Sequence, residues 1–136
     1  MVCVSITVVL DTNMLTVPAQ FGLDIFEEAE RELERNVDFV VIEPVLWELE
    51  KKLEQLSGAA RQRFKVAMDL LKRCTIKKVS NSVTSLPVDQ QILVFTKSIN
   101  GVIATNDKGL IDQAIAEGIP VLFLRGKKRL RLRGTI

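Results

Sequence analysis

The chain has 136 residues, of which 47% are hydrophobic, and this is enough for one domain to bury a continuous core without disulfides or structural metals. It has no histidine, which excludes Ser/His and Cys/His hydrolases, so any catalysis must depend on carboxylates, lysines, hydroxyls or an oxygen-ligated metal. The net charge is +2, but six basic residues lie between positions 125 and 133; +2 less six leaves −4 for the remaining chain, and we expect a polyanionic partner.

The first part of the chain predicts two strands with a helix between them. Residues 2–10 are β-branched and apolar apart from small residues, which indicates a strand covered on both faces. The strand stops at Asp11, and the residues after it are interpreted as a first loop. Residues 22–35 have apolar positions at helical spacing and predict an amphipathic helix, and residues 38–42 predict a short second strand.

The middle of the chain predicts two helices and a third strand. Pro44 is tolerated in the first turn of a helix over residues 43–56, which ends at Ser57 and Gly58. A second helix over residues 59–72 leads into a strand over residues 75–79, and a polar loop follows.

The last part of the chain continues the alternation. Pro87 starts a helix that reaches residue 99, and residues 102–105 predict a fourth strand. A helix over residues 108–116 and a fifth strand over residues 120–124 complete the pattern.

Regular alternation of strand and helix predicts the fold class. It favours an α/β fold, a three-layer α/β/α sandwich around a parallel five-stranded sheet. We expect one domain over residues 1–126 and a basic C-terminal tail over residues 127–136. Cys3 and Cys74 have no metal or redox spacing and are interpreted as buried thiols. No apolar run is long enough to span a bilayer and no signal peptide is apparent, so we expect a cytoplasmic protein without a membrane partner.

Four acids follow the predicted strands and form the candidate active site. Ligands of an open parallel sheet collect at the carboxyl ends of its strands, so acids placed there are expected to converge. One ends the first strand, one follows the fourth strand, one lies about a turn into the helix after the second strand, and one lies in the first turn after Pro87. They are Asp11, Glu48, Asp89 and Asp107.

Carboxylates held close together repel one another, and a divalent cation is the simplest remedy. All-oxygen ligands favour hard cations, so we expect Mg²⁺ or Mn²⁺ and an ion able to acidify water and hold a phosphodiester. Asn13, Thr105 and Asn106 lie beside two of the acids and are expected to support them with hydrogen bonds.

Each acid also has a structural interpretation. Asp89 and Asp107 could cap helix N-termini, and Glu48 could form an i,i+4 surface pair with Lys52. Asp11 could cap a turn, although a carboxylate directly after a fully apolar strand more often has a functional role.

Four segments together resemble the PIN domain family of nucleases. They are Leu10-Asp11-Thr12-Asn13, Leu46-Trp47-Glu48-Leu49, Asp89-Gln90-Gln91-Ile92-Leu93 and Thr105-Asn106-Asp107, and their order and strand context cover nearly the whole chain. The resemblance implies a sheet of order 3-2-1-4-5 and a hydrolase, a magnesium- or manganese-dependent endoribonuclease. It implies that Asp11, Glu48, Asp89 and Asp107 are the catalytic, metal-binding acids.

The resemblance extends to two kinds of PIN protein, archaeal members of the rRNA-processing type and toxins of type II toxin–antitoxin pairs. Val88 stands beside Asp89 where rRNA-processing members often have a second acid, so the number of metals stays open. The possible partners are accordingly an antitoxin protein or a pre-ribosomal particle. Trp47 lies off the apolar stripe of its helix and could contact substrate, a partner subunit or neither. Small PIN proteins resemble one another in forming dimers, so we favour a homodimer interface.

The basic segment is predicted to bind RNA phosphates. Six contacts to single-stranded RNA would give a log–log salt slope of roughly −4, while the alternative is a solvated extension that only improves solubility. Phe21, in the expected first loop, is a candidate stacking platform for an unpaired base. The residues concerned are Arg125, Lys127, Lys128, Arg129, Arg131 and Arg133.

Two other classes compete with the nuclease interpretation. Phosphotransfer receivers and haloacid-dehalogenase-like phosphatases also place Asp after the first strand, but the phosphatase pattern needs a second Asp at Asn13, and the acid pair of receivers is missing. A catalytically inert module that keeps the fold to bind RNA or assemble a complex is the main alternative.

Overall fold

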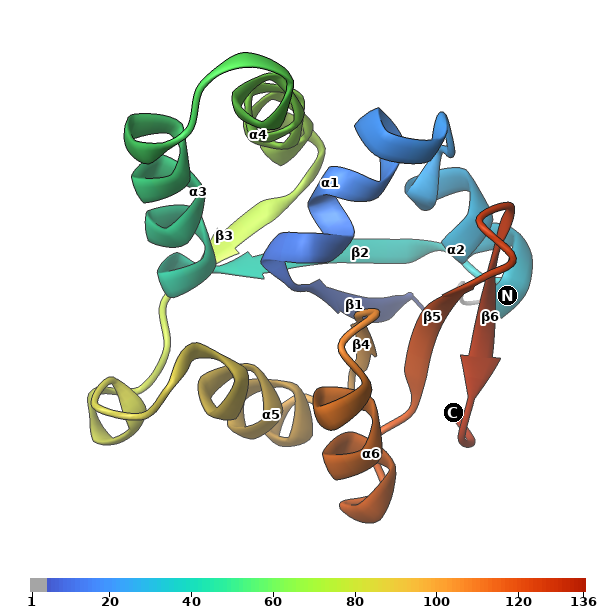
Figure 1. Ribbon diagram of the computed structural model, residues 1–136. Helices are drawn as coiled ribbons and strands as arrows, with labels where there is room; N and C mark the ends of the chain where they lie inside the picture. The colour runs from blue at the N-terminus through green and yellow to red at the C-terminus, as the bar shows by residue number, and fades with distance from the viewer. Residues whose placement is uncertain (1–4) are drawn as a thin grey trace.

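The structure, a computed structural model, describes residues 5–136 and is built around a six-stranded sheet (Figure 1). Its strand order is β3-β2-β1-β4-β5-β6, with parallel pairing everywhere except between β5 and β6. The expected α/β class and the order 3-2-1-4-5 are therefore confirmed. The strands are β1 (Ile6–Leu10), β2 (Val37–Ile42), β3 (Thr75–Lys77), β4 (Val102–Ala104), β5 (Val121–Arg125) and β6 (Arg129–Arg133). The expected first strand also included residues 2–4, with Cys3, which lie outside the described residues.

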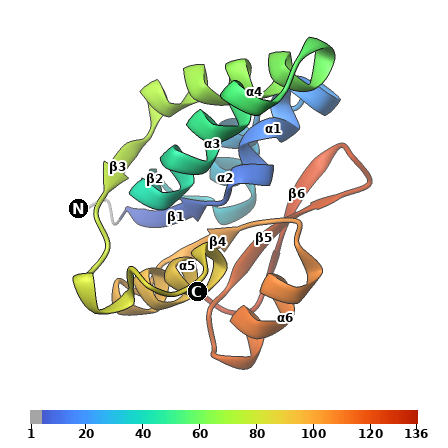
Figure 2. The ribbon, with the colours of Figure 1, turned by 60° about the vertical axis from the view of Figure 1, so that its left-hand side comes forward.

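Helices cover both faces of the sheet, which confirms the three-layer arrangement (Figure 2). Helices α1, α3 and α4 lie together on one face, and α5 and α6 lie on the other. Helix α2 packs against β2 and β6. The helices are α1 (Thr12–Phe21), α2 (Ile25–Leu33), α3 (Glu43–Gln55), α4 (Gly58–Leu70), α5 (Val88–Ser98) and α6 (Lys108–Ala116).

The core lies where the central strands are covered on both sides. Val8, Val9 and Leu10 of β1 are at most 1% exposed, and all three residues of β4 are fully buried. A nearly continuous apolar strand is what a doubly covered parallel sheet requires. Fully burying such side chains contributes about 1.5–3 kcal/mol each, so β1 and β4 form a rigid support for the residues that follow them.

Residues 12–21 form a helix, and the first loop expected there is wrong. Asp11 caps this helix, because its Oδ1 accepts a hydrogen bond from the Met14 N–H at 2.7 Å. Met14 and Leu15 are fully buried on its inner face, and Gly22 ends it with a φ of 66°. Pro18 lies inside the helix and obscures it in the sequence, because proline cannot donate the usual backbone hydrogen bond.

Residues 127–136 are part of the sheet rather than a free basic tail. Arginine and leucine alternate along β6, with Leu130 buried and the arginines exposed, so the strand has one face against the core. It pairs with β5 through a tight turn, which gives six strands instead of the expected five.

The outer edge of β6 is covered by α2. Glu28 accepts a hydrogen bond from the Leu130 N–H at 3.2 Å, and Glu32 accepts one from the Leu132 N–H at 2.7 Å. These carboxylates satisfy backbone donors that would otherwise be open to pairing with another strand.

Candidate active site

The four predicted acids line one cavity of about 310 Å³ at the carboxyl ends of the parallel strands. Asp11 directly follows β1, and Asp107 lies three residues beyond β4 at the start of α6. Glu48 comes from α3 and Asp89 from the first turn of α5. The complete lining is Asp11, Thr12, Asn13, Glu48, Lys52, Phe64, Asp89, Ile92 and Asp107.

Asp11 is the buried member of this set, with 5% of its surface exposed. Its Oδ1 accepts from the Met14 N–H, and its Oδ2 accepts a hydrogen bond from the Thr105 hydroxyl. Thr105 is fully buried, and its Oγ1 in turn accepts from the Asp107 N–H at 3.1 Å. One threonine therefore connects the loops that carry two of the acids.

Burial and mutual repulsion disfavour the ionised forms of two of these carboxyls, Asp11 and Asp89. Burial raises the pKa of Asp11 from 3.8 to about 6, and repulsion from Asp89 and Asp107 adds to the shift. The hydrogen bonds from Thr105 and Met14 oppose it. The pKa of Asp89 is also raised, first by burial and then by the charges of Asp107 and Glu48. A cation in this cavity would relieve the repulsion.

The structural alternatives hold for some acids and not for others. Asp107 does cap a helix, because its Oδ1 accepts from the Leu110 N–H at 2.9 Å. Asp89 makes no such cap hydrogen bond. Glu48 accepts from the Thr12 hydroxyl at 2.6 Å, and no salt bridge to Lys52 is present in the described part of the chain.

The cavity is not a preformed metal cage. Within residues 5–136, no three acidic or cysteine side chains converge closely enough to hold a metal ion. Three of the carboxylates instead accept hydrogen bonds from nearby donors, the Thr12 hydroxyl and the Met14 and Leu110 N–H groups. The donor set is all oxygen, which suits a hard divalent cation, and the cavity has room for one. The role of these acids as metal ligands stays a prediction.

The supporting residues differ in position. Asn13 is exposed and lines the cavity. Asn106 is turned toward β5, where its Oδ1 accepts from the Leu124 N–H at 2.7 Å, so it fixes the loop between β4 and α6. Lys52 lines the cavity, although the sequence suggested it only as a surface partner of Glu48. The i,i+4 spacing of these two residues was the available signal, since it places them on the same helix face.

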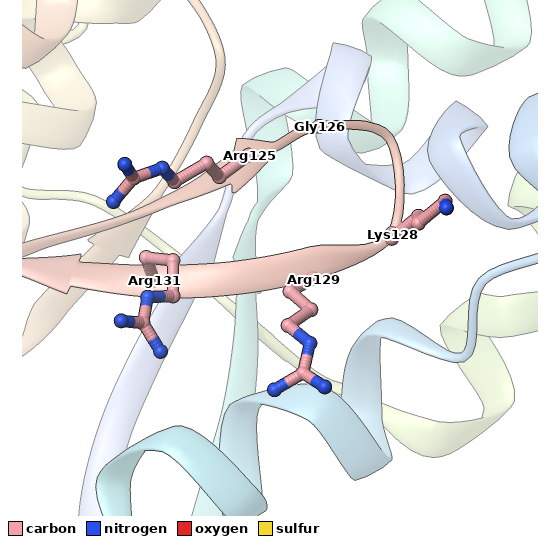
Figure 3. Close-up of a pocket in the computed structure, with 5 residues that line it drawn as sticks. All are labelled: Arg125, Gly126, Lys128, Arg129 and Arg131. Carbon is pink, nitrogen blue, oxygen red and sulfur yellow. The ribbon is translucent and has the colours of Figure 1, made fainter.

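The six basic residues fall into two groups. The strand arginines are Arg129, Arg131 and Arg133, and the turn cations are Arg125, Lys127 and Lys128. Among the strand arginines, the Arg131 guanidinium lies 3.7 Å from a carboxylate oxygen of Glu32, and that of Arg133 lies 3.9 Å from one of Asp112. The pKa of Glu28 is lowered first by its hydrogen bond from Arg31, and the charge of Arg129 adds to this shift. The turn cations form no salt bridge within residues 5–136. In Figure 3 the side chains around the turn point in different directions rather than toward one centre.

Fold and site define an α/β domain with a carboxylate-lined cavity at the carboxyl ends of its central strands. The chain belongs to the PIN-like domain family, whose sequence model matches residues 8–127. This confirms the resemblance found in the sequence.

Three known proteins are similar over most of their length. The chain is 30% identical over 130 residues to Ribonuclease VapC4 of Methanocaldococcus jannaschii, covering 95% of this chain and 98% of that one. The PIN domain endonuclease Utp24 has a similar fold, with a TM-score of 0.74, 24% identity, and coverage of 96% of this chain and 92% of its own. A domain of a functionally unknown protein from Methanocaldococcus jannaschii has a TM-score of 0.62, 19% identity, and coverage of 89% and 92%. None of the helices in residues 5–136 is long and apolar enough to cross a membrane.

Proposed function

We propose that this protein is a divalent-metal-dependent endoribonuclease with Mg²⁺ or Mn²⁺ held by Asp11, Glu48, Asp89 and Asp107. The observation that carries the proposal is the buried carboxyl of Asp11, whose pKa is raised to about 6 and which opens on the same cavity as the other three acids. A group so placed reduces the stability of the fold at neutral pH, which favours a functional role. The relative named as a ribonuclease supports RNA as the substrate.

The side chains of the cavity have separate tasks in this proposal. Thr105 holds Asp11 in one orientation, and Thr12 holds Glu48. Lys52 supplies a cationic side chain in the cavity wall and would stabilise negative charge on a phosphate. Phe64 and Ile92 supply apolar wall that limits access of water. A divalent cation, when bound, supplies Lewis-acid chemistry that stabilises charge on the phosphodiester and acidifies water.

The turn cations are the proposed contacts to RNA phosphates. They lie at the carboxyl end of β5, which is at the same edge of the parallel sheet as the acid cavity, and they form no salt bridge in the described part of the chain. The strand arginines contribute less, because two of them are engaged with Glu32 and Asp112 and would have to leave these partners.

A cleavage assay tests the enzymatic proposal. Wild type is incubated with structured and unstructured RNA in Mg²⁺, Mn²⁺ or EDTA, and compared with Asp11→Asn and with Asp38→Asn, an exposed position on β2. Cleavage should require the metal, disappear in Asp11→Asn and persist in Asp38→Asn. Cleavage in EDTA would exclude the metal mechanism. RNA binding without cleavage by any form would favour the inert module.

The cellular role is either rRNA maturation or that of a toxin. Stable association with pre-ribosomal RNA supports the first, and a tightly bound antitoxin that suppresses cleavage supports the second. A homodimer is proposed because Trp47 is 56% exposed on α3; sedimentation of wild type and Trp47→Ala tests it. The cytoplasmic location stays a prediction.

A further inference from the structure

A groove of about 540 Å³ lies beside the acid cavity, between α1 and the β5–β6 turn. The two share Asn13, and Asn106 in the groove is the chain neighbour of Asp107 in the cavity. The two spaces are therefore close enough for one polymer to occupy both with neighbouring units. The groove is lined by Asn13, Thr16, Val17, Gln20, Phe21, Asn106, Leu124, Gly126 and Lys127.

The lining combines an apolar surface with polar edges. Val17, Phe21 and Leu124 provide the apolar part, while Asn13 and Gln20 are exposed amides. A nucleobase has the complementary chemistry, with two apolar faces for stacking and an edge of hydrogen-bond donors and acceptors.

Lys127 is held over this groove by an unfavourable backbone conformation. Its φ is 60°, and with Gly126 at 64° it occupies the two central positions of the turn closed by the Lys128 N–H and the Arg125 carbonyl. Glycine or asparagine is preferred at such positions, and a lysine there costs roughly 1 kcal/mol.

The side chain of Lys127 reaches the aromatic ring in the groove. Its Nζ lies 5.8 Å from the ring centroid of Phe21, at the outer limit of a cation–π contact. Phe21 is half-buried against the core, and Lys127 is exposed, so this long side chain can move aside from the ring and still place its charge near a phosphate.

We propose that this groove binds a nucleotide of single-stranded RNA next to the one whose phosphate enters the acid cavity. The base stacks on Phe21, and Lys127 pairs with the phosphate of the same nucleotide. The inference rests on the proposed function for the choice of RNA as the polymer. The adjacent cavity and the cation over the ring favour RNA over an apolar peptide, which has no phosphate for Lys127.

The test measures binding rather than cleavage, in EDTA so that no metal-dependent cleavage occurs. The probes are fluorescently labelled ten-nucleotide oligouridine and an abasic ribose-phosphate oligomer of the same length. Phe21→Leu keeps an apolar side chain but removes the flat ring, and Phe123→Leu makes the same change on β5, outside the groove. Thermal unfolding of each variant shows that the fold is retained.

Phe21→Leu should weaken oligouridine binding by about five-fold or more, the lower end of the effect of losing one stacked base. Binding of the abasic oligomer should not change, and Phe123→Leu should change neither. Equal effects of Phe21→Leu on the two oligomers, or no effect on either, would overturn the proposal, as would failure of wild type to bind oligouridine.

Double-mutant cycles test whether Phe21 and Lys127 contact the same nucleotide. Lys127→Asn suits the turn and removes the charge, and Lys128→Asn removes the neighbouring charge outside the groove. The effects of Phe21→Leu and Lys127→Asn should be non-additive, while those of Phe21→Leu and Lys128→Asn should add. Additivity in both cycles would refute the shared nucleotide. If wild type shows no metal-dependent cleavage in the assay above, the proposed nuclease activity is refuted, whatever these binding results are.

Discussion

The substitution Asp11→Asn should stabilise the metal-free protein at neutral pH while it abolishes function. The pKa of Asp11 is 3.8 when it is exposed in the unfolded chain and about 6 in the fold. Between these values the folded state holds a proton that the unfolded state has released, so the free energy of unfolding falls as pH rises. A shift of about 2 units corresponds to about 3 kcal/mol, lost fully above the folded pKa, with roughly half of it lost by pH 5.

Asparagine removes this loss without removing the cap. Its side-chain oxygen can accept from the Met14 N–H, and its amide can donate to the Thr105 oxygen. Urea unfolding in EDTA at pH 4, 5, 6 and 7.5 gives the free energy of unfolding for both proteins. The difference, variant minus wild type, should increase by about 2–3 kcal/mol from pH 4 to pH 7.5.

Two comparisons make this result decisive. Asp38→Asn changes an exposed carboxyl on β2, and its difference from wild type should show no comparable rise. Mg²⁺ or Mn²⁺ should stabilise wild type by about 2.7 kcal/mol at a hundred times the dissociation constant, and should not stabilise Asp11→Asn. A difference between Asp11→Asn and wild type that is constant with pH would refute the argument that burial and repulsion act on this carboxyl.

Three further predictions concern other parts of the structure. Thr105→Val should lower the free energy of unfolding by roughly 1–3 kcal/mol. It should also raise the pKa of Asp11 in the folded protein, since it removes a hydrogen bond that lowers this pKa, and the loss of stability with rising pH should therefore continue to a higher pH. Glu32→Ala should accelerate hydrogen exchange of the Leu132 amide, with Glu30→Ala on the same helix as the unchanged control. The log–log salt slope of RNA binding should be about −2, for three turn cations, rather than the −4 expected for six contacts; a slope near −4 would show that the strand arginines leave their acids.

The sheet could be predicted from sequence because its strands carry a simple signal. Residues 6–10 and 102–104 are almost continuously apolar, which is required of strands covered on both faces. Helix α1 could not, since Pro18 argues against a helix and only the buried side chains of Met14 and Leu15 outweigh it. The alternation of Arg and Leu in β6 was a strand signal, but the density of charge favoured an extended tail.

The acids of the site could be predicted because each follows a strand or lies within the first two turns of a helix at the same edge of the sheet. Their orientations could not, because these depend on donors that only the fold brings near. Thr105 reaches Asp11 from 94 residues away along the chain, and Thr12 reaches Glu48 from 36. The ion pair between Arg131 and Glu32 likewise could not be predicted from the sequence, and it changes which cations are available to RNA.

Asp11 is subject to two opposing demands, and their balance bears on its role. As the cap of α1 it accepts hydrogen bonds that favour the ionised carboxyl, but burial and two neighbouring acids disfavour that form more strongly. A residue needed only as a cap would serve better as asparagine, which caps a helix without this cost. A carboxyl that lowers the stability of the fold at neutral pH is explained when its charge is used, and stability is commonly lower at sites that bind or catalyse. Gain of stability and loss of cleavage in the same Asp11→Asn protein would therefore identify the carboxylate as part of the chemistry rather than of the helix.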